Sequence, residues 1–176
     1  LTPLSGDHAD DADDARAAHA DLRLAAWPAP GGRHMHAGEV GRNILNLHIA
    51  AETMNIYFVK LLLDAGADIN AEDAFGLRPL MYACKCDESS VRRTEPPGLH
   101  DTISMVAKLL EAGANVNARS VSGFSALHIA CVAGRCDVVN VLIAAGAKLE
   151  ARTRAGWTPL HLAAMSDRTD VLRVLA

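Results

Sequence analysis

Apolar residues in the C-terminal two thirds of the chain return at helical spacing, in short blocks that glycine separates. Between residues 123 and 155 the first block runs over Ala126–Ala133 and the second from Val138 to about Ala145. Apolar residues three and four apart share one face of a helix, so each block predicts a short amphipathic helix. Gly134 separates the two blocks and Gly146 follows the second, as expected where a helix ends. The segment therefore predicts a helix-turn-helix unit.

Local residues support these helix boundaries. Gly123 supplies a backbone that adopts positive φ where a loop turns into the first helix. Ser125, and Thr158 at the matching point further on, are placed to cap a helix, and Pro159 suits its first turn. Asp137 is expected to open the second helix of the unit.

Two phrases recur in register with these blocks. The first reads Gly156-Trp-Thr-Pro-Leu-His-Leu-Ala-Ala164, with copies that begin at Gly123, Gly76 and, more weakly, Asn43. Its leucines, Leu47, Leu80, Leu127 and Leu160, are separated by 33, 47 and 33 residues. The second reads Gly113-Ala-Asn-Val-Asn-Ala118, with copies that begin at Gly66 and Gly146.

A 33-residue period built on Thr-Pro-Leu-His-x-Ala resembles the ankyrin-repeat family. The resemblance covers residues 41–176 and implies an all-α repeat solenoid of helix-turn-helix units with β-hairpin loops. We expect repeats at 43–75, 76–122, 123–155 and 156–176, the last one truncated. Because the chain stops within a second helix and does not begin with Met, we expect it to be part of a longer protein.

The second repeat is 14 residues longer than the period, and the excess lies within residues 85–100. Pro96-Pro-Gly98 forbids a continuous helix there. The insertion is either a tolerated solvent loop or, as happens in repeat proteins, a loop on a binding face.

Residues 1–40 do not follow the repeat and form a separate acidic extension. Six aspartates between Asp7 and Asp21 precede a segment expected to be helical to about Ala26, which would cap the exposed side of the first repeat. His34, His36 and Glu39 have a metal-like spacing but fall where a hairpin is expected, so we assign no metal site.

The resemblance assigns a structural role to three histidines. His48, His128 and His161 recur at one repeat position, where ankyrin proteins use histidine to join neighbouring loops by hydrogen bonds. Met81 replaces the histidine in the second repeat, which should weaken the network there. Cys84 and Cys131 fall where Ala51 and Ala164 stand in the other repeats, so they are expected to be reduced packing residues.

Charge and composition argue against several classes of function. The net charge of −4 divides into −7 for residues 1–113 and +3 for residues 114–176. This bias is too weak for nucleic-acid binding, but it favours an acidic stretch of a partner near the C-terminal repeats. The sequence has no apolar run long enough to span a membrane and no phosphate loop, and we expect no catalytic residue and no cofactor. We expect an intracellular protein, cytoplasmic or nuclear.

The expected function is that of a protein-interaction scaffold, which binds a protein or peptide through the concave face of hairpins and first helices. An alternative is the targeting or regulatory arm of a larger enzyme, such as a ubiquitin ligase, kinase, acyltransferase or bacterial effector. Leu77, Phe124 and Trp157 follow the hairpin glycines as an apolar ladder, with Ile44 in the first repeat. The other candidate partner-binding residues are Phe75, Lys85, Arg119, Val121, Val132, Arg152, Arg154 and Met165. Asn70 and Asn117 stand where asparaginyl hydroxylases modify ankyrin proteins, although Asn also simply suits a turn.

Overall fold

The computed structural model describes residues 39–85 and 102–176, and the regular elements within these ranges are all helices. In chain order the helices are α2 (Glu39–Glu52), α3 (Ile56–Asp64), α4 (Pro79–Lys85), α5 (Thr102–Glu111), α6 (Ala126–Ala133), α7 (Cys136–Ala144), α8 (Pro159–Met165) and α9 (Thr169–Leu175). The predictions for the acidic extension, for His34 and His36 and for residues 86–100 of the long loop lie outside the described residues.

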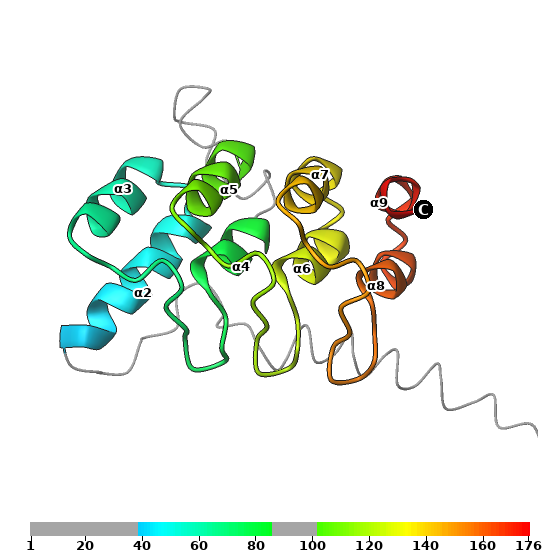
Figure 1. Ribbon diagram of the computed structural model, residues 1–176, viewed down its shortest axis with the longest axis horizontal. Coiled ribbons are helices and arrows are strands. Elements are labelled where there is room, and N and C mark those ends of the chain that lie inside the picture. The colour runs from blue at the N-terminus through cyan, green and yellow to red at the C-terminus, as the bar shows by residue number, and fades with distance from the viewer. Residues whose placement is uncertain (1–38, 86–101) are drawn as a thin grey trace, which may run out of the picture. The chain divides into compact units, whose positions relative to one another are not determined.

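Consecutive helices pack as pairs: α2 with α3, α4 with α5, α6 with α7 and α8 with α9. The first helices of these pairs form one row and the second helices form another (Figure 1). In the first row α2 packs on α4, α4 on α6 and α6 on α8; in the second, α5 packs on α7 and α7 on α9. The links between successive pairs, after α3, α5 and α7, project from the same side of the first row (Figure 1). This arrangement confirms the predicted all-α repeat array. The links have hairpin geometry without regular strands.

Most predicted helix boundaries are correct, and the errors concern starting points. Helix α6 spans Ala126–Ala133 as predicted, and Thr158 caps α8 by accepting a hydrogen bond from the His161 N–H. Helix α7 begins at Cys136, one residue before Asp137, and Arg135 is its N-cap residue. The Arg135 guanidinium bonds the Asp137 carboxylate at 2.9 Å and lowers the pKa of that carboxyl.

The first repeat begins earlier than predicted. Helix α2 starts at Glu39 and runs for 14 residues, against seven or eight for α4, α6 and α8. Glu39 therefore lies in a helix and not in the hairpin expected there.

The anchoring leucines define the core and also its open end. Leu47, Leu80 and Leu127 are at most 2% exposed, whereas Leu160 at the same repeat position is 44% exposed. Among the described residues α8 has a first-row neighbour on one side only, so the outer face of Leu160 has no helix against it.

The buried thiols behave as packing residues, as predicted. Cys84 and Cys131 are fully buried in the last turns of first-row helices, and neither forms a disulfide within the described residues. Burial raises the pKa of the Cys131 thiol to about 12, which keeps it protonated at neutral pH. In the part of the chain that the structure describes, no helix is long and apolar enough to cross a membrane.

Candidate protein-binding surface

Each of the three hairpins is closed by one polar side chain at the same position. Asp73, Ser120 and Thr153 stand three residues before the hairpin glycine. The Asp73 carboxylate accepts a hydrogen bond from the Leu77 N–H at 2.8 Å, and the Ser120 and Thr153 hydroxyls accept from Phe124 and Trp157 at 3.1 Å. In each hairpin the backbone N–H of the first residue also donates to the carbonyl of the residue after the glycine, at 2.8 to 3.0 Å. The acceptors are the carbonyls of Leu77, Phe124 and Trp157. The sequence therefore builds three turns of one geometry.

Neighbouring hairpins are joined at their tips by backbone hydrogen bonds. The Val121 N–H donates to the Phe75 carbonyl at 2.9 Å, and the Arg154 N–H donates to the Ser122 carbonyl at 3.0 Å. Gly123 lies so close to the next hairpin that a Cβ there would be 2.9 Å from the Arg154 nitrogen, and its φ is +83°. Only glycine permits both the positive φ and this approach.

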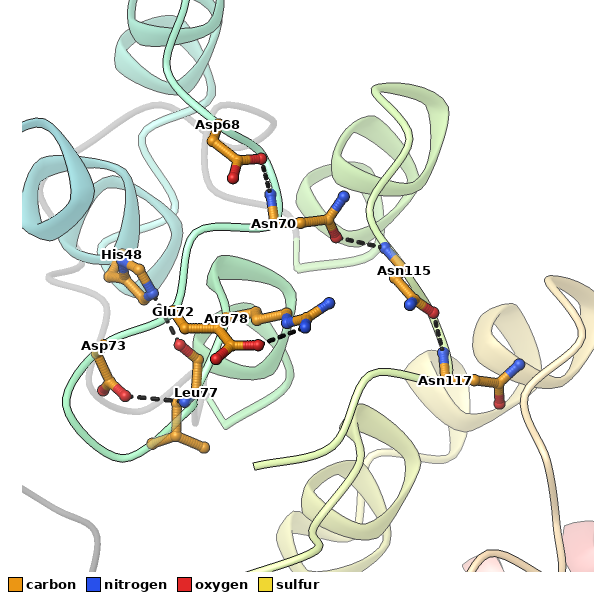
Figure 2. A network of polar contacts seen from close by, with 9 residues as sticks. All are labelled: His48, Asp68, Asn70, Glu72, Asp73, Leu77, Arg78, Asn115 and Asn117. Carbon is orange, nitrogen blue, oxygen red and sulfur yellow. Dashed lines mark hydrogen bonds and ion pairs between the residues drawn. The ribbon is translucent and has the colours of Figure 1, made fainter. Parts of the chain in front are cut away.

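Asparagine side chains join the turns that follow the second-row helices (Figure 2). The Asn70 amide donates to the Gly113 carbonyl at 3.1 Å and accepts from the Asn115 N–H at 2.8 Å. Asn117 repeats this bridge to Gly146 and Lys148, at 3.0 and 2.9 Å. Both ends of each amide are thus committed to the next repeat, which gives a physical reason for asparagine at these positions. Hydroxylation of Asn70 and Asn117 stays a prediction.

The outer surface of the hairpins combines apolar and basic side chains. Phe75 and Val121 are 43% and 53% exposed, and Arg119, Arg152 and Arg154 are exposed as well. We call these five residues the hairpin surface. They come from three hairpins that the backbone bonds above hold side by side.

The predicted ladder behind the hairpin glycines is less exposed. The rings of Phe124 and Trp157 are half-buried and meet the edges of His128 and His161 with centroids 5.8 Å apart. Leu77 is only 3% exposed, which corrects the expectation that it faces outward. A leucine side chain at this position is almost fully covered, whereas the larger aromatic rings of Phe124 and Trp157 keep part of their surface exposed.

The candidates in the last turns of the first-row helices are half-buried. Lys85 forms an ion pair with Glu52 at 3.4 Å, and the Val132 carbonyl accepts a hydrogen bond from Arg168 at 3.1 Å. Met165 is half-buried at the end of α8. Their side chains are partly accessible, but they are not part of the hairpin surface.

Comparison with protein families agrees with this architecture. A model described as ankyrin repeats (3 copies) matches residues 99–176, and a model of the single ankyrin repeat matches residues 47–74. The two matches together cover more than half of the chain. The chain belongs to the ankyrin-repeat family. Over 50 residues it is 50% identical to the putative ankyrin repeat protein FPV223 of fowlpox virus (strain NVSL), a match that covers 28% of this chain and 36% of the relative. The matched region thus spans about a third of the length of that curated relative.

Two of the three ankyrin histidines bond the hairpin that follows their helix, as the resemblance implied. His48 Nε2 lies 3.0 Å from the Leu77 carbonyl, and His128 Nε2 lies 3.2 Å from the Trp157 carbonyl. The His128 ring is fully buried, and its Nδ1 accepts from the Ser125 N–H at 3.2 Å. Burial lowers the pKa of His128 to about 4, because the charged ring is disfavoured away from water, and the hydrogen bond to the Trp157 carbonyl opposes this only in part. His161 is exposed and bonds Thr158 in its own repeat.

The second ankyrin repeat has no histidine at this position, and the helix that carries Met81 bonds the hairpin before it. Met81 is buried and has no donor for the next hairpin. Its neighbour Tyr82 donates its hydroxyl to the Asp73 carboxylate at 2.7 Å. Burial and this carboxylate raise the pKa of Tyr82, so the hydroxyl stays protonated. The weaker network expected at Met81 stays a prediction, since this bond joins α4 to the preceding hairpin and not to the next one.

Two features of the surface were missed by sequence reasoning. Arg119 bonds the Gly123 carbonyl of its own hairpin at 3.2 Å and the Arg152 carbonyl of the next, and Arg78 forms an ion pair with Glu72 at 2.5 Å. Aligning the repeats would have revealed the first contact, since Arg119 and Arg152 share one repeat position. Within the described residues, no group of three His, Cys, Asp or Glu side chains is placed to hold a metal ion.

Proposed function

We propose that this ankyrin array is a protein-interaction scaffold and that it binds its partner through the hairpin surface. Ankyrin repeats are generally protein-interaction modules, and the general role extends to this chain by family membership. The observation that carries the choice of surface is the exposure of Phe75 and Val121 among arginines. Exposed aromatic residues and arginine are over-represented at the energetic centres of protein interfaces.

The rigidity of the hairpins favours this surface further. Hydrogen bonds between backbones hold Phe75 beside Val121, so that little conformational entropy is lost when a partner binds. The half-buried rings of Phe124 and Trp157 lie directly behind these tips and would supply further apolar contact. The alternative, an ankyrin arm of a larger enzyme, would use the same surface and differs only in what is attached to the array.

A random-peptide selection tests the proposal, because the selection supplies its own ligands. A phage-displayed library would be selected on the immobilised full chain, and the affinity of the enriched peptides measured by calorimetry. We expect Phe124→Ala and Trp157→Ala each to weaken binding by at least ~2 kcal/mol, as interface anchors do. Val121→Ser should weaken it by about 1–2 kcal/mol.

The matched control is Tyr57→Ser, since Tyr57 is exposed and belongs to α3, a helix that lies on the other side of the first row from the hairpins (Figure 1). It should leave peptide affinity unchanged. If Tyr57→Ser weakens binding and the hairpin variants do not, the surface is wrongly chosen. If the two ring variants lower only the melting temperature, the rings are structural.

A further inference from the structure

The charge of the hairpins changes sign along the ankyrin array. The residue four positions before the hairpin glycine is Glu72 in the first hairpin but Arg119 and Arg152 in the next two. Glu72 is neutralised by its ion pair with Arg78. Arg119 and Arg152 differ from it, because neither forms an ion pair with an acid in the part of the chain that the structure describes.

The two arginines are held in place by backbone carbonyls and not by acids. Arg119 Nε donates to the Gly123 carbonyl and Arg152 Nη1 to the Gly156 carbonyl, each at 3.2 Å. Arg119 also donates to the Arg152 carbonyl. A guanidinium has five N–H donors, so each keeps donors for a ligand while its orientation is fixed.

A third arginine extends this charge to the hairpin tips. Arg154 occupies the repeat position of Val121 and is exposed, and its side chain makes no hydrogen bond or ion pair within the described residues. From residue 114 onward the chain has four acidic and seven basic side chains, so little negative charge opposes these three. The exposed apolar pair, Phe75 and Val121, lies immediately beside them.

We propose that the hairpin surface recognises an acidic protein segment with an apolar residue, whose carboxylates lie over Arg119, Arg152 and Arg154 and whose apolar side chain packs on Phe75 and Val121. This inference rests on the proposed function and adds to it the chemistry of the partner. Arginine binds carboxylates in bidentate fashion, and a fixed guanidinium loses less entropy in doing so.

An acidic peptide fits this surface better than a nucleic acid does. Nucleic-acid sites need a dense Lys/Arg patch along the phosphate backbone, and here three arginines are followed by two apolar side chains and then by Glu72. A uniformly charged strand that crossed all three hairpins would find no free positive charge on the first one, where Arg78 is paired with Glu72. A peptide can place an apolar residue at the point where the basic charge ends.

Fluorescence anisotropy with the full chain tests the inference, with three labelled 12-residue peptides as probes. The first consists of Asp and Glu around a central Leu, the second has Asn and Gln in place of the acids, and the third has Ser in place of the Leu. We expect the first to bind tightest, with an affinity that falls as salt is raised from 50 to 300 mM. Arg154→Gln should weaken it about fivefold, the upper range for one exposed ion pair.

Matched variants separate local contact from net charge. Arg173→Gln removes the same charge from an exposed position on α9 and should change the affinity less than about twofold. Val121→Ser should weaken the Leu peptide to the level of the Ser peptide and leave the Ser peptide unaffected. Far-UV circular dichroism of each variant checks that the array is folded.

Several results would overturn the inference and leave the proposed function intact. These are equal binding of the acidic and neutral peptides, equal effects of Arg154→Gln and Arg173→Gln, and tighter binding of a 12-nucleotide oligothymidine that Arg154→Gln abolishes. If the random library yields ligands for the hairpin surface that lack acids, the scaffold role stands and the acidic partner is wrong. If Arg154→Gln proves unfolded, Arg154→Lys takes its place and should also weaken the acidic peptide, because an ammonium group does not bind a carboxylate in bidentate fashion.

Discussion

Protonation of His128 is expected to destabilise the ankyrin array in mild acid. In the folded protein its Nδ1 accepts the Ser125 N–H at 3.2 Å and its Nε2 faces the Trp157 carbonyl at 3.2 Å. A second ring proton must go to Nδ1, which then no longer accepts from the Ser125 N–H, and the Ser125 hydroxyl at 2.8 Å is the acceptor left for that proton. Acid therefore breaks the bond between His128 and the backbone at the start of helix α6 and places a charge in the core, while the Nε2–H still faces the Trp157 carbonyl.

The size of the effect follows from the two pKa values. The pKa of His128 is about 4 in the folded protein, against about 6.5 in an unfolded chain. The unfolded state thus binds more protons between these values, so the stabilisation is complete above pH 6.5 and is lost as the pH falls towards 4. One pKa unit corresponds to about 1.4 kcal/mol, so about 3 kcal/mol is lost between pH 7 and pH 4.

Urea denaturation at several pH values measures this loss, with His128→Gln as the variant that removes it. The free energy of unfolding should fall by about 3 kcal/mol less between pH 7 and pH 4 in His128→Gln than in the wild type. His161→Gln, at the exposed equivalent position, should keep the wild-type pH dependence. An imidazole NMR titration of His128 with a midpoint near 6.5, or the same acid dependence in both variants, would refute the reasoning.

Three further predictions concern contacts between repeats, and each is measured by chemical denaturation. Gly123→Ala and Gly156→Ala share the strain of positive φ, but only Gly123 meets the next hairpin, so its variant should lose at least ~1 kcal/mol more. Equal losses would contradict the contact. Leu127→Ala should cost about 2–5 kcal/mol and Leu160→Ala under ~1 kcal/mol, since only the first is fully buried; similar costs would show that Leu160 is covered in solution. Asn117→Ala should lower the free energy of unfolding by about 1–3 kcal/mol, because it leaves two backbone groups of the next turn without protein partners. An unchanged free energy of unfolding would show that water replaces the amide.

Repetition let the sequence by itself determine the fold. Each unit repeats the same caps, glycines and apolar spacing, so Ala126–Ala133 could be assigned as a helix to the residue. The start of α2 could not, because the first repeat has no preceding hairpin glycine and the helix continues back to Glu39. Sequence patterns predict the ends of a helix where capping residues and glycines mark them. They fail in a terminal repeat that lacks these residues.

Only the tertiary structure decided which of the candidate residues form a surface. Leu77, Phe124 and Trp157 share one repeat position, yet Leu77 is buried and the rings are half-exposed, because side-chain size against the adjacent hairpin sets exposure. The hydrogen bond between the Tyr82 hydroxyl and the Asp73 carboxylate likewise joins residues nine apart across a turn. Such contacts depend on the distance and orientation between a helix and the hairpins beside it. Hydrophobic periodicity predicts the helix but not this distance or orientation.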